Sequence, residues 1–381
     1  MSRSPAPLPP EGVAAALRPF GSSRMLPAAA YTSAEVFAWE GRHLLAGSWV
    51  CLGREPDLWD GGVTQRAYDV GGVPVLLTRV EGDARALANT CRHRGHELLA
   101  AGNSSARQSM VCPYHAWSYA LDGSLRAAPA MTTAPGFDPG EHALVELPLA
   151  RWHGWLFVNA SGDPPPFAAH IGALESLVAP YRPETLVRLA THDYDVATNW
   201  KVAHENYHEC YHCPSIHPEL CRVSPPASSA NYDLPGAWVG GRMDLREGAE
   251  TMSLDGGSSG VPLPGLDGEG RRSVLYLDLF PNLLLSLHPD YVMTHLLTPL
   301  AAGRTRIECS WYFPAADIDP SYAVKFWDLT NRQDWAACES VYRGLCSPHY
   351  VPGPLAPGED AVHRFVSMVA RSYLGGVLDS Q

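Results

Sequence analysis

Short apolar runs separated by turn-forming residues make up the chain between Trp49 and Asn159. The runs are WVCLG, TQRAYDV, VPVLLTRV, ARALANT, SMVCPYHAWSYA and LVELPLARWHGWLFVNA, and Gly, Pro, Asp and Asn lie between them. Runs rich in β-branched and aromatic residues and bounded by turn formers are typical of β-strands joined by tight turns. This part of the sequence therefore predicts a small all-β domain.

The pattern changes after the segment SGDPPPF at 161–167, whose turn formers and three prolines are typical of a linker. Beyond it we predict helices at 168–179, 200–211, 320–345 and 360–373, and strands at 186–196, 273–287, 291–300 and 304–313. Another helix is predicted at 34–45, with Thr32 or Ser33 as its N-cap. Residues 224–270 have little pattern and much Gly, Ser and Pro, so we expect a mobile loop or an active-site cover.

These elements predict an α+β protein of two domains, which suits a length of 381 residues. We expect the small all-β domain at 46–160, inserted ahead of a catalytic domain at 161–381 built on an antiparallel sheet with covering helices. Residues 1–45 are expected to supply a loose tail, Met1 to Gly12, and a helix that packs on the catalytic part.

Charge and cysteine content narrow the classes of partner. The formal net charge is −12, from 40 acidic and 28 basic residues, which makes nucleic acid a poor partner because phosphate binding needs a basic surface. No apolar run reaches the roughly 18–20 residues that span a membrane, and the N-terminus lacks the apolar stretch of a signal peptide. Several of the nine cysteines lie close to histidines. We therefore expect a cytoplasmic protein with reduced thiols.

Two Cys/His pairs have metal-ligand spacing. Cys91 and His93 form C-x-H, and Cys112 and His115 form C-x-x-H, with 18 residues between the pairs. Two such loops facing each other would make a closed site of four donors. Two Cys and two His hold either zinc or a Rieske [2Fe–2S] cluster. Zinc fingers usually place both Cys before both His and near a helix, whereas Cys precedes His in each pair here, which favours the cluster.

A second group of histidines lies in NWKVAHENYHECYHCPSIHP at 199–218. Mononuclear non-haem iron takes two His and one carboxylate and keeps positions open. Three interpretations compete: a zinc-hydrolase H-E-x-x-H motif at 204–208 with Glu205 as base, a redox or metal-binding pair of Cys210 and Cys213, and an iron site using His212 and His217.

The sequences CRHRG at 91–95 and CPYHAWSYALDG at 112–123 resemble the Rieske oxygenase family. Respiratory Rieske proteins carry one more cysteine in each loop, where His96 and Tyr114 stand here, so the resemblance implies a cluster of lower potential. It also implies a helix-grip-like catalytic domain.

The same resemblance decides among the three interpretations of the histidine-rich segment. The family pattern Asn-x-x-Asp/Glu-x-x-His-x-x-x-x-His is met by Asn206, Glu209, His212 and His217, after Asn-Trp-Lys at 199–201. The resemblance assigns iron binding to His212 and His217, and catalytic roles to Asn206 and to Glu209 as a bridge.

The third iron ligand is expected from a C-terminal helix, where the run at 333–345 resembles the family and Asp334 matches the ligand. Gln333 and Tyr342 depart from the usual acid and glutamine, but neither is a ligand. Asp328 and Glu339 are the alternative carboxylates.

The resemblance also implies partners and a reaction. A flavin and iron–sulfur reductase would pass electrons from NAD(P)H to the cluster, and Glu209 would carry them to the iron of a neighbouring subunit in a ring, commonly a homotrimer. Oxygen and a small organic substrate would react there. No Rossmann or P-loop glycine pattern occurs, so nicotinamide is not expected to bind this chain.

The substrate is suggested by two runs, ECYHCPSIHPE and FPNLLLSLHPDYVMTHLLTPL, which look most like the quaternary-ammonium branch, including enzymes of glycine betaine, carnitine and choline. Oxidation of an N-methyl group would release formaldehyde. The cation would bind to aromatic faces, for which the candidates are Tyr207, Trp238, Tyr276, Tyr291, Trp311 and Tyr312. The alternatives are ring hydroxylation of an aromatic acid or arene, and an electron carrier without oxygenase activity.

Overall fold

The structure is a computed structural model that describes residues 4–131 and 133–376. It divides into two compact units. One contains residues 40–165, and the other combines the chain before residue 40 with the chain from residue 166 onward. The sequence of the first unit therefore interrupts that of the second.

The unit of residues 40–165 contains three antiparallel sheets. Their strands, in sheet order, are β1 (Val50–Arg54), β11 (Trp155–Val158) and β10 (Leu149–Trp152); β5 (Ser104–Ser105), β2 (Gln65–Val70), β3 (Val73–Val80), β4 (Asp83–Ala88) and β9 (Glu146–Leu147); β6 (Ser109–Val111), β7 (Ser118–Ala120) and β8 (Leu125–Ala127). The remaining elements are a π-helical turn at Gly41–Leu45, α4 (Glu55–Leu58) and 3-10 turns at Asp60–Gly62 and Pro139–His142.

The position of strand β3 within its sheet explains why the sequence of this strand is almost continuously apolar. Successive side chains of a strand point to opposite faces of the sheet. Val75 and Leu77 belong to one core cluster, and Leu76, between them, belongs to the other. Both faces of this central strand are therefore buried, and the second cluster also contains Cys91 and Cys112.

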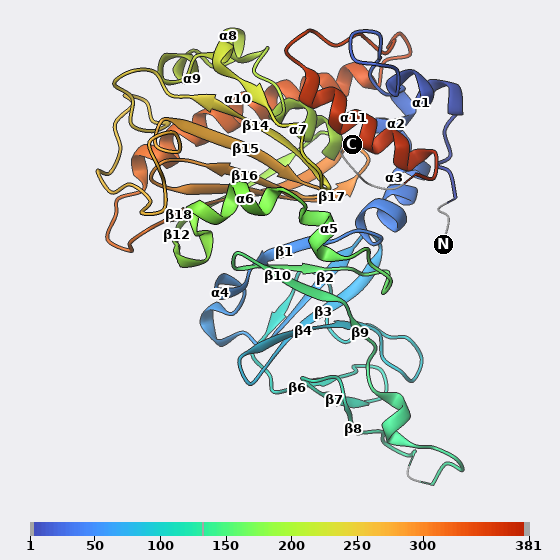
Figure 1. The fold of residues 1–381 in the computed structure, drawn as a ribbon. Coiled ribbons are helices and arrows are strands. Elements are labelled where there is room, and N and C mark those ends of the chain that lie inside the picture. The colour runs from blue at the N-terminus through green and yellow to red at the C-terminus, as the bar shows by residue number, and fades with distance from the viewer. Residues whose placement is uncertain (1–3, 132, 377–381) are drawn as a thin grey trace. The chain divides into compact units, whose positions relative to one another are not determined.

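The other unit is built on a seven-stranded antiparallel sheet. In sheet order its strands are β12 (Val187–Val196), β18 (Arg304–Phe313), β17 (Val292–Ala301), β16 (Leu283–Leu287), β15 (Ser273–Leu279), β14 (Trp238–Asp244) and β13 (Ala230–Asn231). The helices are α1 (Pro10–Ala16), α2 (Ala28–Thr32), α3 (Ala34–Glu40), α5 (Phe167–Ile171), α6 (Leu174–Val178), α7 (Trp200–Tyr207), α8 (Cys213–Ile216), α9 (Pro218–Val223), α10 (Ser321–Leu345) and α11 (Asp360–Tyr373), with 3-10 turns at Ala179–Tyr181, Pro183–Thr185 and Pro226–Ser228. Helix α7 packs against α10 and α11, and all three helices contact the sheet (Figure 1).

The predicted α+β class with antiparallel sheets is confirmed, and the two C-terminal helices lie within one residue of their predicted bounds. The single strand predicted at 273–287 is wrong, because the chain turns at Pro281 and Asn282 to form the hairpin of β15 and β16. The helix predicted at 168–179 is broken at Gly172, where φ is +53°. Residues 224–270 are not all loop, since they contain β14.

The expected loose tail is also wrong over its described part. Helix α1 begins at Pro10, and the preceding residues are tied to the same unit. The Ala6 N–H donates to the Tyr373 carbonyl at 2.8 Å, and Trp39 Nε1 donates to the Ser4 carbonyl at 3.0 Å. These bonds hold the N-terminal segment to α11 and α3.

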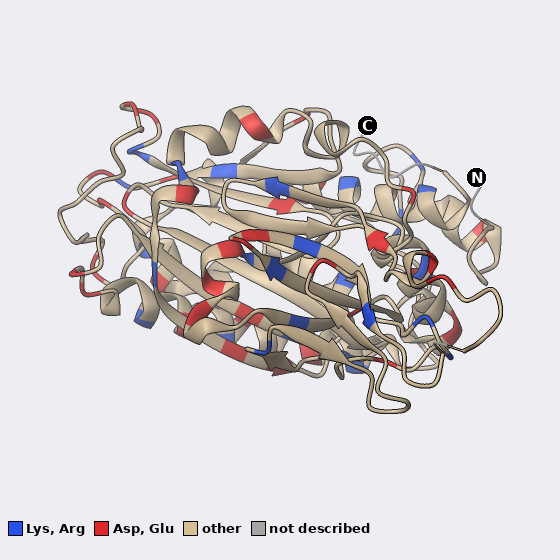
Figure 2. Ribbon diagram, turned by 90° about the horizontal axis from the view of Figure 1, so that it is seen from below, with Lys and Arg blue, Asp and Glu red and all other residues tan. Residues whose placement is uncertain are grey.

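Charged side chains of both signs are interspersed along the ribbon (Figure 2). Cross-strand pairs on β12 and β18 are examples: Arg304 pairs with Asp195 at 2.5 Å and Arg306 with Asp193 at 2.6 Å. Exposed pairs like these contribute little to stability. Within the described residues, no helix combines the length and the apolar character needed to cross a membrane.

A buried carboxyl group on α7 predicts a pH dependence of stability. Burial raises the pKa of Glu205 to about 8, against the opposing effects of the Tyr31 hydroxyl, which donates to Glu205 at 2.7 Å, and of Lys201. Because an unfolded Glu titrates near 4.5, the folded chain keeps a proton between these values that the unfolded chain has lost. The free energy of unfolding therefore falls as pH rises through this range.

Between pH 6 and pH 9, the free energy of unfolding should fall by about 2–3 kcal/mol more in the native chain than in the Glu205→Gln variant. Urea unfolding at the two pH values measures the difference. The exposed Glu35→Gln serves as control and should retain the native pH slope. Equal slopes for Glu205→Gln and the native chain would contradict the assignment.

Candidate metal centres

The loops that carry the two Cys/His pairs have the same backbone geometry. In each loop the cysteine carbonyl accepts from the N–H four residues later, that of Gly95 at 2.9 Å and that of Ala116 at 3.0 Å. Both of these residues have positive φ, +78° and +58°. In each loop the cysteine N–H also donates to the carbonyl five residues later, at 2.9 and 2.8 Å. Cys91 and Cys112 therefore occupy equivalent positions.

The two cysteines belong to one core cluster, and the two histidines lie next to each other. The cysteines are each only 2% exposed, whereas the His93 ring is exposed and lies 4.6 Å from the His115 ring, centroid to centroid. His115 Nδ1 is buried and has no hydrogen-bond partner among the described residues. Burial, then His93 and Arg94, lower the pKa of His115, which favours the neutral imidazole that binds metal. Two buried sulfurs and two outer imidazoles fit the ligand set of a Rieske cluster.

Tyr119 on β7 contacts this site, and sequence reasoning missed it. Its hydroxyl lies 3.3 Å from Cys91 Sγ and accepts from the Arg92 N–H at 3.0 Å. Burial and the contact with Cys91 raise the pKa of Tyr119, so the hydroxyl keeps its proton and can donate to the sulfur. Hydrogen bonds to cluster sulfurs tune the reduction potential. Only the spacing of Tyr119 seven residues beyond Cys112 could have signalled the contact.

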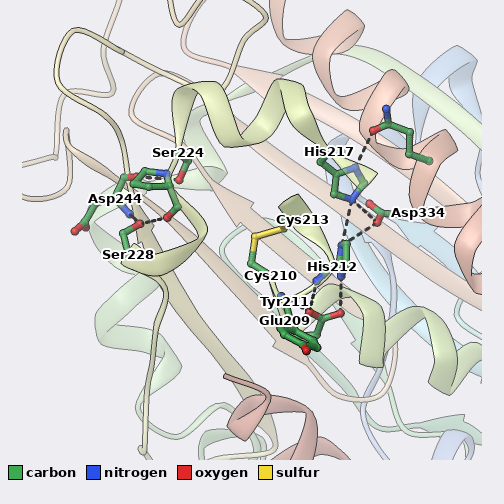
Figure 3. Close-up of a disulfide and its surroundings, with 12 residues drawn as sticks. Glu209, Cys210, Tyr211, His212, Cys213, His217, Ser224, Ser228, Asp244 and Asp334 are labelled. Carbon is green, nitrogen blue, oxygen red and sulfur yellow. Dashed lines mark hydrogen bonds and ion pairs between the residues drawn. A yellow bond between two sulfur atoms is a disulfide. The ribbon is translucent and has the colours of Figure 1, made fainter. Parts of the chain in front are cut away.

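The second group of donors converges in the other unit (Figure 3). His212 lies just before α8, His217 lies between α8 and α9, and Asp334 projects from α10. Nε2 of His217 lies 2.8 Å from Asp334 Oδ1 and 3.1 Å from Nε2 of His212, which is 3.4 Å from the same carboxylate oxygen. Two imidazoles and one carboxylate within this distance fit an iron site with open positions.

Each imidazole is oriented through its other nitrogen. His212 Nδ1 lies 2.5 Å from Glu209 Oε1, and His217 Nδ1 lies 2.7 Å from Gln333 Oε1. An acceptor at Nδ1 fixes the proton there and leaves the Nε2 lone pair for a metal. Helix α7 ends ahead of Glu209, earlier than predicted, because Glu209 Oε2 accepts from the N–H groups of Tyr211 and His212 and turns the chain.

The carboxylates and imidazoles of the site stabilise one another's charged forms. Burial alone would lower the pKa of His212, but hydrogen bonds to Asp334 and Glu209 raise it to about 10. Burial alone would raise the pKa of Asp334, but hydrogen bonds from the two histidines lower it. The carboxylate is therefore ionised and ready to bind a metal that displaces the proton of the imidazole.

The other sequence candidates lie elsewhere. Asp328 receives hydrogen bonds from Tyr194 and Arg332, and Glu339 accepts from the Ala197 N–H. His204 and His208 of the H-E-x-x-H motif both contact one oxygen of Asp278, at 2.6 and 2.9 Å, and form no open metal site. Asn206 lines the cavity that the three iron-site residues also line.

Cys210 and Cys213 form a disulfide within the segment that runs from Glu209 to His217 (Figure 3). The expectation of reduced thiols is wrong for these two residues in this structure, while the other seven cysteines form no disulfide. The disulfide lies in the turn that carries His212, so the pair braces the segment rather than binding a metal of its own.

Gln333 gives a test of ligand orientation. We expect Gln333→Leu to weaken iron retention about 10–100-fold, because His217 loses the acceptor that fixes its proton. Gln333→Glu keeps an acceptor and should retain the iron. The rate of iron release to a chelator measures the effect, with the visible absorption of the cluster as internal control. Equal release from the Leu variant and the native protein would contradict the role.

Comparisons with known proteins identify the family. Residues 183–375 match the family "Ring hydroxylating alpha subunit (catalytic domain)", and residues 48–138 match the "Rieske [2Fe-2S] domain". The chain belongs to the Rieske oxygenase alpha subunits. The cofactors of this alpha subunit are accordingly a Rieske [2Fe–2S] cluster and a mononuclear iron.

Relatives and solved structures extend the match to most of the alpha subunit. The glycine betaine monooxygenase oxygenase subunit of Chromohalobacter salexigens is 30% identical over 373 residues, covering 89% of this chain and 83% of the relative. The carnitine monooxygenase oxygenase subunit of Escherichia coli is 32% identical over 195 residues, about half of each chain. The fold matches the quaternary ammonium Rieske monooxygenase CntA, with a TM-score of 0.77, 24% identity and coverage of 96% of this chain and 98% of that chain.

Proposed function

We propose that this alpha subunit oxidises an N-methyl group of a small quaternary ammonium compound such as glycine betaine. In this proposal Cys91, His93, Cys112 and His115 hold the cluster, on a domain of residues 46–160. The iron is held in the domain of residues 161–381 by His212, His217 and Asp334. The glycine betaine and carnitine enzymes among its relatives support the substrate class.

One observation carries the proposal: a continuous run of ring side chains lines the cavity of the iron-site residues. In order along the run these are Trp327, Tyr276, Tyr207, His295 and Trp335. Successive ring centroids are 6.2, 6.0, 6.3 and 5.8 Å apart. Aromatic faces attract a quaternary ammonium ion, which has no N–H to donate and is bound best by π-systems.

Two of the six sequence candidates for this surface, Tyr207 and Tyr276, line the cavity. The other four, Trp238, Tyr291, Trp311 and Tyr312, are buried and are not among its lining residues. The two tryptophans of α10 were missed because their positions, 327 and 335, look like an ordinary packing face of a helix.

The reaction needs one O₂, two electrons and two protons for each methyl group. One oxygen atom enters the C–H bond to give an N-hydroxymethyl product, and the other leaves as water. The hydroxymethyl group then loses its hydroxyl proton to water and the C–N bond breaks, which releases formaldehyde and leaves the bonding electrons on the demethylated amine. When bound, the iron supplies the activation of O₂. The protein's residues orient the cation on the aromatic faces, fix the imidazoles through Glu209 and Gln333, and restrict water.

A flavin and iron–sulfur reductase is the proposed electron donor, and a homotrimer is the proposed assembly. Glu209 would then bridge the iron site to a cluster histidine of a neighbouring copy. The position of Glu209 supports this, because Tyr211, whose N–H donates to Glu209, is 71% exposed in the single chain and can contact a partner. Size measurement in solution tests the assembly.

Release of formaldehyde tests the substrate class. The holoenzyme is supplied with a reductase, NAD(P)H and a panel of methylated ammonium compounds, and formaldehyde is measured together with O₂ uptake. We expect one formaldehyde per O₂ for at least one compound. An aromatic substrate is the second candidate, because the same ring-lined cavity can stack an arene. Hydroxylated benzoate or arene without formaldehyde from any amine would favour it.

A further inference from the structure

Tyr276 lines the cavity, and its hydroxyl group has no hydrogen-bond partner among the described residues. Its oxygen is buried, and no described residue donates to it or accepts from it. The neighbouring Tyr207 differs, because its hydroxyl donates to the Leu285 carbonyl at 2.8 Å and lies 3.0 Å from Ser286 Oγ. Buried hydroxyls are normally hydrogen-bonded, so an unpaired one in a binding cavity points to a ligand acceptor. Burial raises the pKa of Tyr276, so this hydroxyl remains a donor at neutral pH.

Tyr276 lies toward the end of the cavity away from the carboxylate of the iron site. Its ring contacts Trp327, and Trp327 precedes Asp334 by seven residues on α10. Seven residues are two turns of a helix, or about 10 Å along its axis. A substrate whose methyl group lies at the Asp334 end therefore presents its other end to Tyr276. Figure 1 shows β15 and α10, the two elements that carry these residues.

The proposed substrate carries an acceptor for this hydroxyl. Glycine betaine has a carboxylate next to its ammonium group, and the bond from a hydroxyl to a carboxylate is a strong, charge-assisted one. Arg242 follows Gly241, the cross-strand neighbour of Tyr276 on β14, so its side chain points to the opposite face of the sheet, where it pairs with Glu269.

We propose that Tyr276 is a specificity-determining residue whose hydroxyl donates a hydrogen bond to the carboxylate of a zwitterionic ammonium substrate. This inference rests on the proposed function. The aromatic run holds the ammonium end, and Tyr276 selects substrates that also carry a carboxylate. A quaternary ammonium ion without a carboxylate leaves the hydroxyl unpaired and is bound more weakly.

Calorimetric binding to the holoenzyme, with no reductase present, tests this without turnover. The probes are glycine betaine, 4-trimethylammoniobutyrate and tetramethylammonium, which lacks the carboxylate. We expect the native protein to bind the better of the two betaines more tightly than tetramethylammonium. Tyr276→Phe should reduce that preference about 10-fold or more, while affinity for tetramethylammonium stays unchanged. The variant removes one oxygen atom that has no hydrogen-bond partner among the described residues, so its melting temperature should match the native value.

Tyr207→Phe is the matched control, because its hydroxyl is already satisfied by the protein. Any loss of affinity in that variant should fall equally on betaines and tetramethylammonium. An unchanged preference in Tyr276→Phe, with tetramethylammonium still bound, would overturn the role of Tyr276 and leave the proposed function standing. Failure of the native protein to bind any of the three probes would instead overturn the proposed function, and this inference with it.

Discussion

Replacing Asp334 with alanine is expected to remove the mononuclear iron and leave the cluster in place. Asp334 is the only carboxylate among the described residues that meets both His212 and His217 at this site, and it supplies the negative charge that the cation needs. Two imidazoles alone leave an incomplete ligand set for iron. Iron should fall from about three to about two atoms per chain, and substrate oxidation by a factor on the order of 10³ or more.

Iron analysis and the spectrum of the cluster measure this outcome together. Asp328→Ala is the matched control, since Asp328 lies on the same helix but pairs with Arg332, Tyr194 and His192 instead. That variant should retain three irons per chain, within error. A fully loaded Asp334→Ala protein would show that another group completes the site, and the assignment would be abandoned.

Glu209→Gln should keep both metals but lower oxidation of the substrate about 10–100-fold. Glu209 accepts with both of its oxygens, Oε1 from the His212 imidazole and Oε2 from the backbone N–H groups of Tyr211 and His212. A glutamine has one acceptor and one donor, so one of these contacts becomes donor against donor. The charge beside the imidazole is lost as well, while the three ligand atoms remain.

Stopped-flow kinetics locate the defect in Glu209→Gln. Reduction of the cluster by the reductase should keep its native rate, and the following oxidation in the presence of substrate and O₂ should slow. The control is Glu339→Gln, which changes a carboxylate of α10 that accepts from the Ala197 N–H. This variant should have the rates of the native protein. Native rates in Glu209→Gln would rule out the proposed bridge.

The parts of this protein that could be predicted from sequence are those whose signal is local. Helices α10 and α11 have sustained apolar periodicity, and each Cys/His loop carries its ligands within a few residues. The fold class and the cluster were predicted from these signals, whereas the mononuclear iron was predicted from the family resemblance. The hairpin of β15 and β16 was missed because both strands are almost entirely buried, so the apolar residues on either side of Pro281 and Asn282 resemble one continuous strand.

The parts that required the structure are contacts between distant segments. Asp334 was assigned by resemblance alone, because a carboxylate on a helix face is usually only solvated. Gln333 was noted as a departure, and only its contact with His217, 116 residues away, shows that it orients a ligand. The unpaired Tyr276 hydroxyl depends on what other elements leave uncontacted, which no local pattern records.

The interruption of one unit by the other has a consequence for biosynthesis. Domains fold as units while the ribosome is still extending the chain. Residues 40–165 emerge complete and in order, whereas Tyr31 and Ala6 must wait for partners on α7 and at Tyr373, close to the C-terminus. The unit that carries the two Cys/His loops can therefore fold long before the unit that contains the iron-site residues is complete.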